Sequence, residues 1–389
     1  MSSPATETGG DRATTDPELH LRLLVCTPKY APQVGGAETW LRALLEAMSA
    51  RGHDVSVIAR AAAEADEDHV AGGIPVHRVR GGRVAFARAI GAGIRRARPD
   101  AVLAQYSALA PATWAAHRAG VPTVGIVHDV YGWRESWRIK GPLTGTARHV
   151  GLERSLRWLR PDAFLVNSRA TARRLGPLAG DRPVTVVPAG ADHLPARHGG
   201  ASAQDSDRVV FVGRLVKQKG AADLLDAVAM LHSEGVAVRA VVIGSGPQEP
   251  ALRELAGPLG ASITFAGRVS DAELDEAIRG AAVLVLPSTR EGWGLAITEA
   301  AARGVPYVAY DIPAVGEQHD ALQGGVLVEP SPRALAGAMR RLLDDPGERR
   351  RLGETGAANA ANLRWSNAAE VAGSAIARVV HASPSRRPR

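Results

Sequence analysis

Residues 20–51 read HLRLLVCTPKYAPQVGGAETWLRALLEAMSAR, and this order of residue types sets the expected fold. The run HLRLLVCTP (20–28) is apolar and rich in branched side chains, as in a strand that is covered on both faces. A Gly-rich turn follows, and an amphipathic pattern from about Ala37 to Arg51 then predicts a helix. A buried strand, a tight turn and a helix form the first unit of a parallel α/β sheet.

The same unit recurs along the chain. The further expected strands are DVSVIAR, IPVHRVR, AVLAQY, PTVGIVHD, AFLVNS and VTVVPAG in the first half, and RVVFVG, VRAVVIG, SITFAG, AVLVLPS, PYVAYD and GGVLVEP in the second. Between the two series lies LPARHGGASAQDSD (194–207), which is polar, lacks apolar periodicity and is interpreted as a linker. We therefore expect an α/β protein of two doubly wound, Rossmann-like parallel-sheet domains that face each other across a ligand-binding cleft.

The expected boundaries follow from these patterns. They are a disordered N-terminus at 1–19, a first domain at 20–193, the linker at 194–207, a second domain at 208–365, a last helix at 366–381 that crosses back to the first domain, and a disordered tail at 382–389.

Composition is that of an ordinary globular protein, with 389 residues, 45% apolar and 22% charged. The single cysteine, Cys26, stands in an apolar run, so no disulfide forms within the chain and a reducing compartment is favoured. Its side chain is interpreted as a small buried hydrophobe rather than a nucleophile. The polar N-terminus is unlike a signal peptide, and no run reaches the ~20 apolar residues of a spanning helix. We expect a cytoplasmic location.

The net charge of +7 belongs entirely to the first half, because residues 1–193 hold 25 basic and 18 acidic residues and residues 194–389 hold 22 of each. Residues 131–160 carry seven basic and two acidic residues with three of the seven tryptophans, and residues 83–98 add five arginines. Such a surface either contacts an anionic membrane peripherally, at its inner face, or has its tryptophans packed inside and its arginines in solvent. No nucleic-acid motif is present, and no nucleic-acid partner is expected.

Three Gly-rich or basic turns follow expected strands. In QVGGAET (33–39), Gly35 and Gly36 open the backbone before a helix start that suits an anion, or they simply make a tight turn. In GRLVKQKG (213–220), Arg214 and Lys219 could converge on a phosphate, or the segment is a solvated basic loop. In IGSGPQEPAL (243–252), two glycines, Gly244 and Gly246, allow close approach to the backbone.

The stretch REGWGLAITEA (290–300) follows the expected strand AVLVLPS, so Glu291 stands at the carboxyl end of that strand. Gly294 is expected to begin a helix, with Glu299 on its second turn. Free backbone N–H groups around Trp293 to Leu295 suit a diphosphate, and we interpret the flanking glycines as giving access to them. Diphosphate donors between two carboxylates that accept hydroxyl hydrogens describe a site for a nucleotide sugar.

The chain resembles a retaining glycosyltransferase of the GT4 family (glycosyltransferase group 1), which has the GT-B architecture. The resemblance covers about residues 20–380 and rests on motifs that occur in order. They are GGAE (35–38), His128 in IVHD, Asn167-Ser168, VVPAGAD (186–192), GRLVKQKG, GSGP and EGWGLAITEA.

The resemblance implies roles for the second, donor-binding domain. Glu291 matches the residue that accepts hydrogen bonds from hydroxyls of the donor sugar, and Glu299 matches the one that holds the ribose. Arg214 and Lys219 match a diphosphate clamp that neutralises the leaving group. On this basis the two glutamates are not an acid/base pair but hold the two ends of one donor.

Further positions carry over in the same way. Gly36 matches the glycine that lets the first, acceptor-binding domain approach the diphosphate, and Val269 matches a position whose backbone meets the nucleobase. His128 matches a residue beside the transferred sugar, or is a structural strand-end histidine. Gly294 and Leu295 would offer backbone donors.

Two positions depart from the family pattern. Trp293 stands where Phe is common and would reshape the wall of the site, and Ala189 stands where Asn is frequent, which changes the hydrogen bonding of that loop.

The implied reaction moves a hexosyl group, with retention of configuration, from a UDP- or GDP-sugar to a hydroxyl of a small molecule or carbohydrate. The alternatives are the same transfer to a membrane-associated lipid, or a protein that binds a nucleotide sugar without catalysis. No cofactor beyond the donor is implied. No His/Cys cluster has metal-ligand spacing, so a metal-independent enzyme is expected, in which Arg, Lys and a helix start replace Mg²⁺.

Overall fold

The computed structural model describes residues 20–383 except 34, 63–66, 132–136, 138–140, 142, 144–153 and 194–204. The expected disordered N-terminus, most of the tail at 382–389 and most of the linker at 194–207 lie outside the described residues. So does most of the basic, Trp-rich segment at 131–160.

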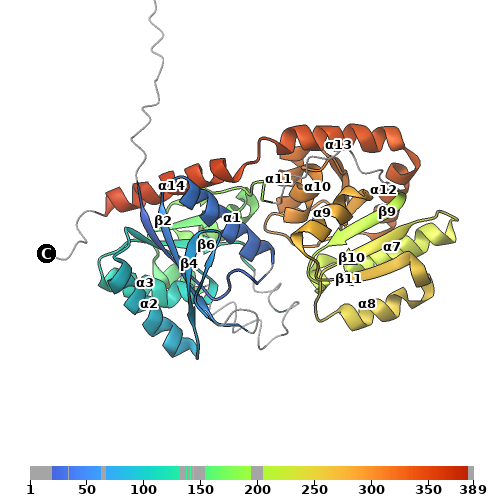
Figure 1. The fold of residues 1–389 in the computed structure, drawn as a ribbon. Coiled ribbons are helices and arrows are strands. Elements are labelled where there is room, and N and C mark those ends of the chain that lie inside the picture. Colours follow the sequence, from blue (N-terminus) through green and yellow to red (C-terminus); the bar gives the residue numbers. More distant parts are fainter. Residues whose placement is uncertain are drawn as a thin grey trace, which may run out of the picture.

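Two separate parallel sheets confirm the expected fold class (Figure 1). The first has the order β3-β4-β2-β1-β5-β6-β7-β8 and the second β11-β10-β9-β12-β13-β14. The strands of the first are β1 (Arg22–Thr27), β2 (Asp54–Arg60), β3 (His69–Ala71), β4 (Ile74–Val79), β5 (Ala101–Gln105), β6 (Thr123–Val127), β7 (Ala163–Val166) and β8 (Val184–Val186). The strands of the second are β9 (Asp205–Val212), β10 (Arg239–Ile243), β11 (Ile263–Gly267), β12 (Ala281–Leu286), β13 (Tyr307–Tyr310) and β14 (Gly325–Val328). The short β3 pairs antiparallel with β4 and was not expected from the sequence.

Helices cover both faces of the first sheet, which explains why its strands are apolar throughout. The helices are α1 (Gly36–Ala50), α2 (Arg83–Ala97), α3 (Leu109–Arg118), α5 (Arg154–Leu159) and α6 (Arg169–Ala179), with α14 (Trp365–Ala382) from the end of the chain. Alternate residues of β1 enter different cores: Leu23 and Val25 join the core under α1 and α14, whereas Leu24 and Cys26 join the core under α2 and α3. Cys26 is fully buried, and burial raises the pKa of its thiol to about 12, so the thiol behaves as a small hydrophobe.

The second domain repeats the plan with α7 (Ala221–Ser233), α8 (Glu249–Ala256), α9 (Asp271–Arg279), α10 (Leu295–Ala301), α11 (Pro313–Leu322), α12 (Pro332–Asp344) and α13 (Pro346–Ala360), and with the 3₁₀ turn η3 (Lys217–Lys219). Local signals set several helix starts. Ser270 caps α9 in a reciprocal arrangement with Glu273, and Ser331 and Asp345 cap α12 and α13, each followed by a proline.

Each sheet has one point where the strand order reverses. In the first sheet, β1 lies between β2 and β5; in the second, β9 lies between β10 and β12. The loops that leave the carboxyl ends of such neighbouring strands diverge to opposite faces and leave a crevice for a ligand. The expected site residues follow β9, β10, β11 and β12 in one domain and β1 and β6 in the other.

The last helix, α14, belongs in space to the first domain, where it packs on α1 (Figure 1). The junction is held by backbone contacts: Ala191 N–H donates to the Leu363 carbonyl at 2.6 Å, and Trp365 N–H donates to Asp192 Oδ1 at 2.9 Å. A Cβ on Gly190 would lie 2.4 Å from the Trp365 nitrogen, so only glycine allows this approach.

We predict that Gly190→Ala lowers the free energy of unfolding by about 1–3 kcal/mol, because the added methyl group forces α14 away from its seat. The measurement is urea unfolding followed by circular dichroism. Gly337→Ala is the matched control, because a Cβ at this exposed position of α12 meets nothing within 4 Å. That variant should be stabilised by about 0.5–1 kcal/mol through better helix propensity. Equal stability of Gly190→Ala and the wild type would show that the junction is not tightly packed.

Candidate active site between the two domains

Lys219 and Glu291 form the centre of the site in the second domain. The Lys219 Nζ lies 2.6 Å from Glu291 Oε1, with the lysine side chain partly exposed and the carboxylate buried. Lys219 ends η3 after β9, and Glu291 lies in the loop after β12. The structure therefore places two expected site residues, 72 positions apart, in direct contact at the reversal point of the sheet.

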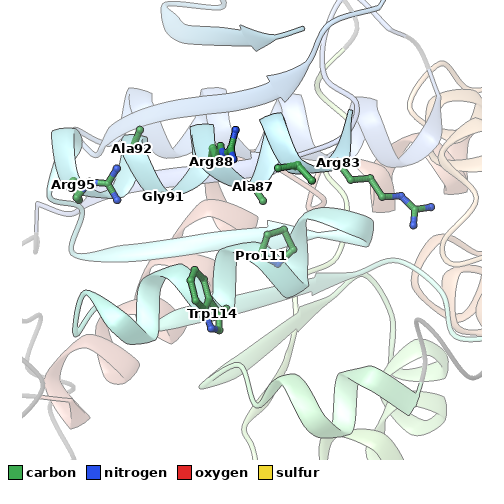
Figure 2. Close-up of a pocket in the computed structure, with 9 residues that line it drawn as sticks. Arg83, Ala87, Arg88, Gly91, Ala92, Arg95, Pro111 and Trp114 are labelled. Carbon is green, nitrogen blue, oxygen red and sulfur yellow. The ribbon is translucent and has the colours of Figure 1, made fainter. Parts of the chain in front are cut away.

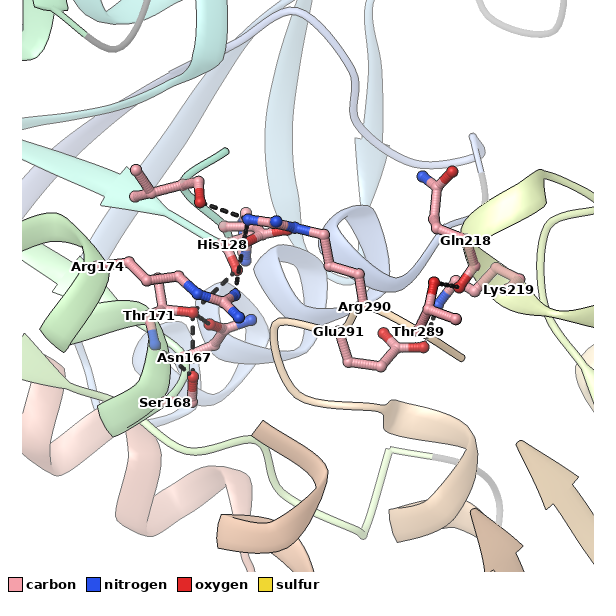
Figure 3. A network of polar contacts seen from close by, with 12 residues as sticks. His128, Asn167, Ser168, Thr171, Arg174, Gln218, Lys219, Thr289, Arg290 and Glu291 are labelled. Carbon is pink, nitrogen blue, oxygen red and sulfur yellow. Dashed lines mark hydrogen bonds and ion pairs between the residues drawn. The ribbon is translucent and has the colours of Figure 1, made fainter. Parts of the chain in front are cut away.

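The two loops that carry this pair are bound tightly to each other. Thr289 N–H donates to the Gln218 carbonyl at 3.0 Å, beside the Lys219–Glu291 pair (Figure 3). Gly220 has a φ of +69°, and a Cβ there would lie 2.0 Å from the Pro287 carbonyl oxygen. Lys219 is thus held on a loop with little freedom to shift, which suits a cation that must meet a small anionic group.

The other expected donor residues of this domain lie on adjacent loops. A Cβ on Gly244 would meet the Gly213 carbonyl and one on Gly246 the Leu215 carbonyl, so backbone packing between the loops after β9 and β10 explains both glycines. Arg214 is exposed, and its side chain forms no ion pair with a described residue. Val269 is half-buried beyond β11, at the edge of the sheet.

His128 stands at the carboxyl end of β6 in a buried chain of hydrogen bonds. Its Nε2 lies 3.0 Å from Gln105 Oε1, while Gln105 Nε2 donates to Thr27 Oγ1 at 2.6 Å, and Thr27 Oγ1 donates to the Lys29 carbonyl at 2.8 Å. This order of donors gives His128 a proton on Nε2 and a lone pair on Nδ1. Trp40 of α1 packs edge-on against the imidazole, with ring centroids 5.0 Å apart.

Burial determines the charge of His128. The loss of hydration lowers the pKa of the imidazole to about 4, because the charged form is the one that burial disfavours. The residue is therefore neutral at physiological pH and serves as a fixed hydrogen-bonding group.

Arg290 joins the two domains beside this histidine. Its Nε lies 2.5 Å from Asp129 Oδ2 and its Nη2 lies 2.8 Å from Asp129 Oδ1. The guanidinium also donates to the Val130 carbonyl and lies 4.0 Å from the centroid of the Tyr131 ring. Arg174 of α6 contacts the same Asp129 carboxylate at 3.2 Å. Figure 3 shows Arg290 and Glu291 projecting in opposite directions, one toward His128 and the other toward Lys219.

Gly292, between Glu291 and Trp293, lies in close contact with the first domain. A Cβ on Gly292 would lie 2.2 Å from the His128 carbonyl oxygen and 2.6 Å from Asn167 Nδ2. The close approach of the first domain therefore requires glycine at position 292 whether or not a ligand binds there. That the glycines of this motif give access to a diphosphate stays a prediction. Gly294 does require glycine for its own backbone, because it precedes α10 with a φ of +92°.

Trp293 and Leu295 pack toward the first domain. The Trp293 indole is 5% exposed, joins the core that contains Trp40, and donates from Nε1 to Thr298 Oγ1 at 3.0 Å. Leu295, the first residue of α10, faces the Gly-rich turn: a Cβ on Gly36 would lie 4.0 Å from Leu295 Cδ1. The structure thus brings the turn after β1, including Gly35 and Gly36, to the start of α10.

Glu299 is bound separately from Glu291. Its Oε1 lies 2.9 Å from His193 Nε2, and both side chains are buried. His193 packs in turn against Trp365 at the base of α14, with ring centroids 6.0 Å apart. The two glutamates therefore have different partners on different elements.

Several of these residues carry no local sequence signal. Gln105 is a single polar residue at the end of β5, and Arg290 lies in the loop after β12 with nothing in the sequence to indicate its partner. Glu317 of α11 binds the backbone N–H groups of Arg169 and Ala170 at 2.8 and 3.0 Å, capping α6 from the other domain. His193 directly follows the VVPAGAD motif, which was the one available hint.

The described residues lack two features. No group of three or more His, Cys, Asp or Glu side chains within the described ranges is arranged to hold a metal ion. None of the described helices combines the length and the apolar character needed to cross a membrane.

Comparison with known proteins agrees with this architecture. Two family models match: "Glycosyltransferase Family 4" over residues 34–193 and "Glycosyl transferases group 1" over residues 196–359. A glycogen synthase from Mycobacterium tuberculosis is 30% identical over 369 residues, covering 85% of this chain and 88% of that protein. A D-inositol 3-phosphate glycosyltransferase from Acidothermus cellulolyticus is 29% identical over 377 residues, covering 86% and 84%.

Solved structures share the fold at low sequence identity. Sucrose-phosphate synthase from Thermosynechococcus elongatus superimposes with a TM-score of 0.78 at 22% identity, covering 93% of this chain and all of that one. Anabaena HepE in complex with UDP-glucose gives 0.72 at 18% identity, covering 93% and 100%. The expected GT-B architecture is confirmed, and the two family models and the 30% identical relative show that this chain belongs to glycosyltransferase family 4, the group 1 glycosyltransferases.

Proposed function

We propose that the chain transfers a hexosyl group from a nucleoside-diphosphate sugar to a hydroxyl of a small molecule or carbohydrate, with retention of the anomeric configuration. The observation that carries the proposal is the Lys219–Glu291 pair at the β9/β12 reversal point, joined through Arg290 to the loop of His128. Relatives named as glycosyltransferases and solved neighbours with bound UDP or UDP-glucose support the choice of donor.

In the proposed reaction the donor lies across the pair. Lys219 and the exposed Arg214 bind the diphosphate as cations, and Glu291 then accepts hydrogen bonds from hydroxyls of the sugar. The bond between the anomeric carbon and the phosphate oxygen breaks, and the acceptor oxygen bonds to the same carbon on the same face. The acceptor proton passes to a phosphate oxygen of the departing nucleoside diphosphate, so atoms and charge balance without a protein nucleophile. The two cations stabilise the charge that develops on the leaving group.

Other residues hold the ends of the donor. Glu299 receives the ribose, with His193 fixing its carboxylate; Val269 and the glycines at 244 and 246 border the base and the phosphates. Neutral His128 donates from Nε2 to Gln105, which fixes the ring beside the transferred sugar. Contacts between the domains limit the access of water to the anomeric carbon.

A thermal-shift screen of the full chain against UDP, GDP, ADP and their sugars tests the proposal most directly. A ligand present at a hundred times its Kd stabilises the folded state by about 2.7 kcal/mol, so one base should give a clear rise in Tm. Assays with a panel of soluble acceptors and the responding donor then detect transfer. No response to any nucleoside diphosphate would contradict the proposal, and binding without transfer or hydrolysis would favour a non-catalytic binding protein.

We predict that Glu291→Gln reduces transfer at least 100-fold without weakening the binding of the nucleoside diphosphate, because the carboxylate is assigned to the sugar and its loss frees Lys219 for the phosphates. Lys219→Ala should instead weaken nucleoside-diphosphate binding by about 2 kcal/mol, the value of a charged hydrogen bond. Calorimetric titration and initial rates separate the two effects. Normal turnover of Glu291→Gln would contradict the role of Glu291 in binding the donor sugar.

Burial of His128 predicts a pH-dependent stability. The pKa of this imidazole is about 4 in the folded chain and about 6.5 when unfolded, so the unfolded state binds the proton first. The stabilisation is present above pH ~6.5 and is lost progressively toward pH ~4. The Tm of the wild type should therefore fall more steeply over this range than the Tm of His128→Gln. His381→Gln, which alters an exposed histidine of α14, should follow the wild type; identical slopes for all three proteins would refute a buried neutral His128.

Arg290 is predicted to act as a positioning residue through Asp129. Arg290→Ala and Asp129→Asn should each lower kcat about tenfold or more while the affinity for the nucleoside diphosphate stays near the wild-type value, because Lys219 is untouched. In the double variant the losses should be strongly non-additive, since both substitutions break the same contact. Arg290→Lys should restore little of the lost kcat, because lysine cannot form the bidentate contact with the Asp129 carboxylate. Additive losses, or loss of nucleotide binding, would contradict this role.

A further inference from the structure

The positive charge of the chain is concentrated in one part of the first domain. Residues 69–128 contain eight arginines and a single acidic residue, Asp100, which gives +7 over this segment, equal to the net charge of the whole chain. Neither α2 nor α3 contains an acidic residue. All of these arginines except the buried Arg78 are exposed, and exposed cations attract anions over a distance set by ionic strength.

A groove runs between α2 and α3 on this surface (Figure 2). Its volume is about 680 Å³, and it is lined by Arg83, Arg88 and Arg95 of α2 and by Pro111 and Trp114 of α3. Figure 2 shows these arginines spaced along one helix rather than converging on a point. Twelve residues of helix extend about 18 Å, so the arginines suit several separate anionic groups rather than one phosphate.

The same surface exposes large apolar side chains. Trp114 is 65% exposed and Val84 is 64% exposed. The Arg118 guanidinium lies over the Trp114 ring at 4.9 Å from its centroid. On α5, which packs against α3, Trp158 is 81% exposed. Exposed indoles beside arginines are the combination found at the boundary between lipid headgroups and acyl chains, where the ring is buried and the cation meets phosphate.

We propose that the α2–α3 groove docks the protein on the surface of an anionic lipid bilayer. Val84 and Trp114 enter the boundary region, and Arg83, Arg88 and Arg95 contact lipid phosphates. Charge complementarity selects this occupant: the surface lacks acidic groups over both helices, and the arginines are spread over a length that matches neighbouring headgroups.

The orientation of the groove gives docking a functional consequence. α2 begins just after the carboxyl end of β4, and Pro111 lies in the first turn of α3, just beyond β5. One end of the groove therefore lies at the sheet edge that carries Gln105 and His128. A bilayer docked there would lie beside the open edge of the site and could present hydroxyl-bearing headgroups as acceptors. This consequence rests on the proposed function, whereas docking itself does not.

Co-sedimentation of the full chain with vesicles tests docking. Vesicles of phosphatidylcholine with added phosphatidylglycerol should bind the protein at low salt, vesicles of phosphatidylcholine alone should not, and high salt should release it. An arginine near an anionic surface contributes about a fivefold change in affinity. The affinity of the triple variant R83Q/R88Q/R95Q for the anionic vesicles should therefore be at least about tenfold lower than that of the wild type.

Control variants show whether vesicle binding depends on the groove itself. R333Q/R350Q/R351Q removes the same charge from exposed positions of the second domain and should bind vesicles like the wild type. Trp114→Ala should weaken binding, whereas Val371→Ala, at an exposed valine of α14 on the opposite face of the sheet, should not. All variants should keep the thermal shift given by the nucleoside diphosphate, which shows that they are folded and that the donor site is separate.

Three outcomes would overturn the proposal. Equal losses in the two triple variants would show general charge attraction rather than a docking surface. Unchanged binding of R83Q/R88Q/R95Q or of Trp114→Ala would place the contact elsewhere. Groove-dependent binding of a soluble polyanion such as heparin, without binding to anionic vesicles, would assign the groove to a polyanionic partner instead.

Discussion

The bidentate contact between Arg290 and Asp129 is the constraint on which the arrangement of the site depends. Each partner is the chain neighbour of an expected site residue: Arg290 precedes Glu291, and Asp129 follows His128. One contact therefore sets the distance between the Glu291 carboxylate of one domain and the His128 imidazole of the other. A buried ion pair contributes little net stability, because desolvation offsets much of the attraction. Its value here lies in geometry, since the planar fork admits few orientations.

Other contacts between the domains make that geometry specific. Gly292 lets the loop reach the backbone of His128 and the amide of Asn167, and Glu317 caps α6 from the opposite domain. The Trp293 indole packs into the core of the first domain. These contacts are of three kinds: a close backbone approach, a charged helix cap and a buried apolar side chain. If one of them is lost, the others still hold the two domains in position. This is why Arg290→Ala is expected to affect turnover more than folding.

The fold was accessible from the sequence because its signals are local. Each parallel strand is a short apolar run that ends in a turn. Helices such as α9 and α12 begin at serine capping residues, which can be recognised in the sequence. Some candidate site residues at strand ends, such as Lys219 and Glu291, were predicted from the same local pattern, whereas His128 and Val269 were predicted only from the resemblance to the family. Their partners were not: Arg290 contacts a residue 161 positions away, and Glu299 contacts one 106 positions away. Contacts between residues so far apart produce no periodic pattern in the sequence. Gly292 is a further case, because its close contact with His128 and Asn167 of the other domain could not be predicted from neighbouring residues.

Charge is distributed so that donor binding and surface attraction are separate properties. The second half of the chain is neutral overall, so under the proposed function the attraction of an anionic donor would come from a few cations at the cleft, Arg214 and Lys219 among them, and not from a general field. Lys219 is already paired with Glu291, which cancels its long-range field while leaving both groups positioned for short-range contacts. Four arginines lie instead on α2 and one on α3, where the proposed docking would use their long-range field. Because salt screens exposed charges far more than buried pairs, ionic strength should weaken the attraction exerted by the exposed α2 arginines more than the contact between Lys219 and the buried Glu291 carboxylate.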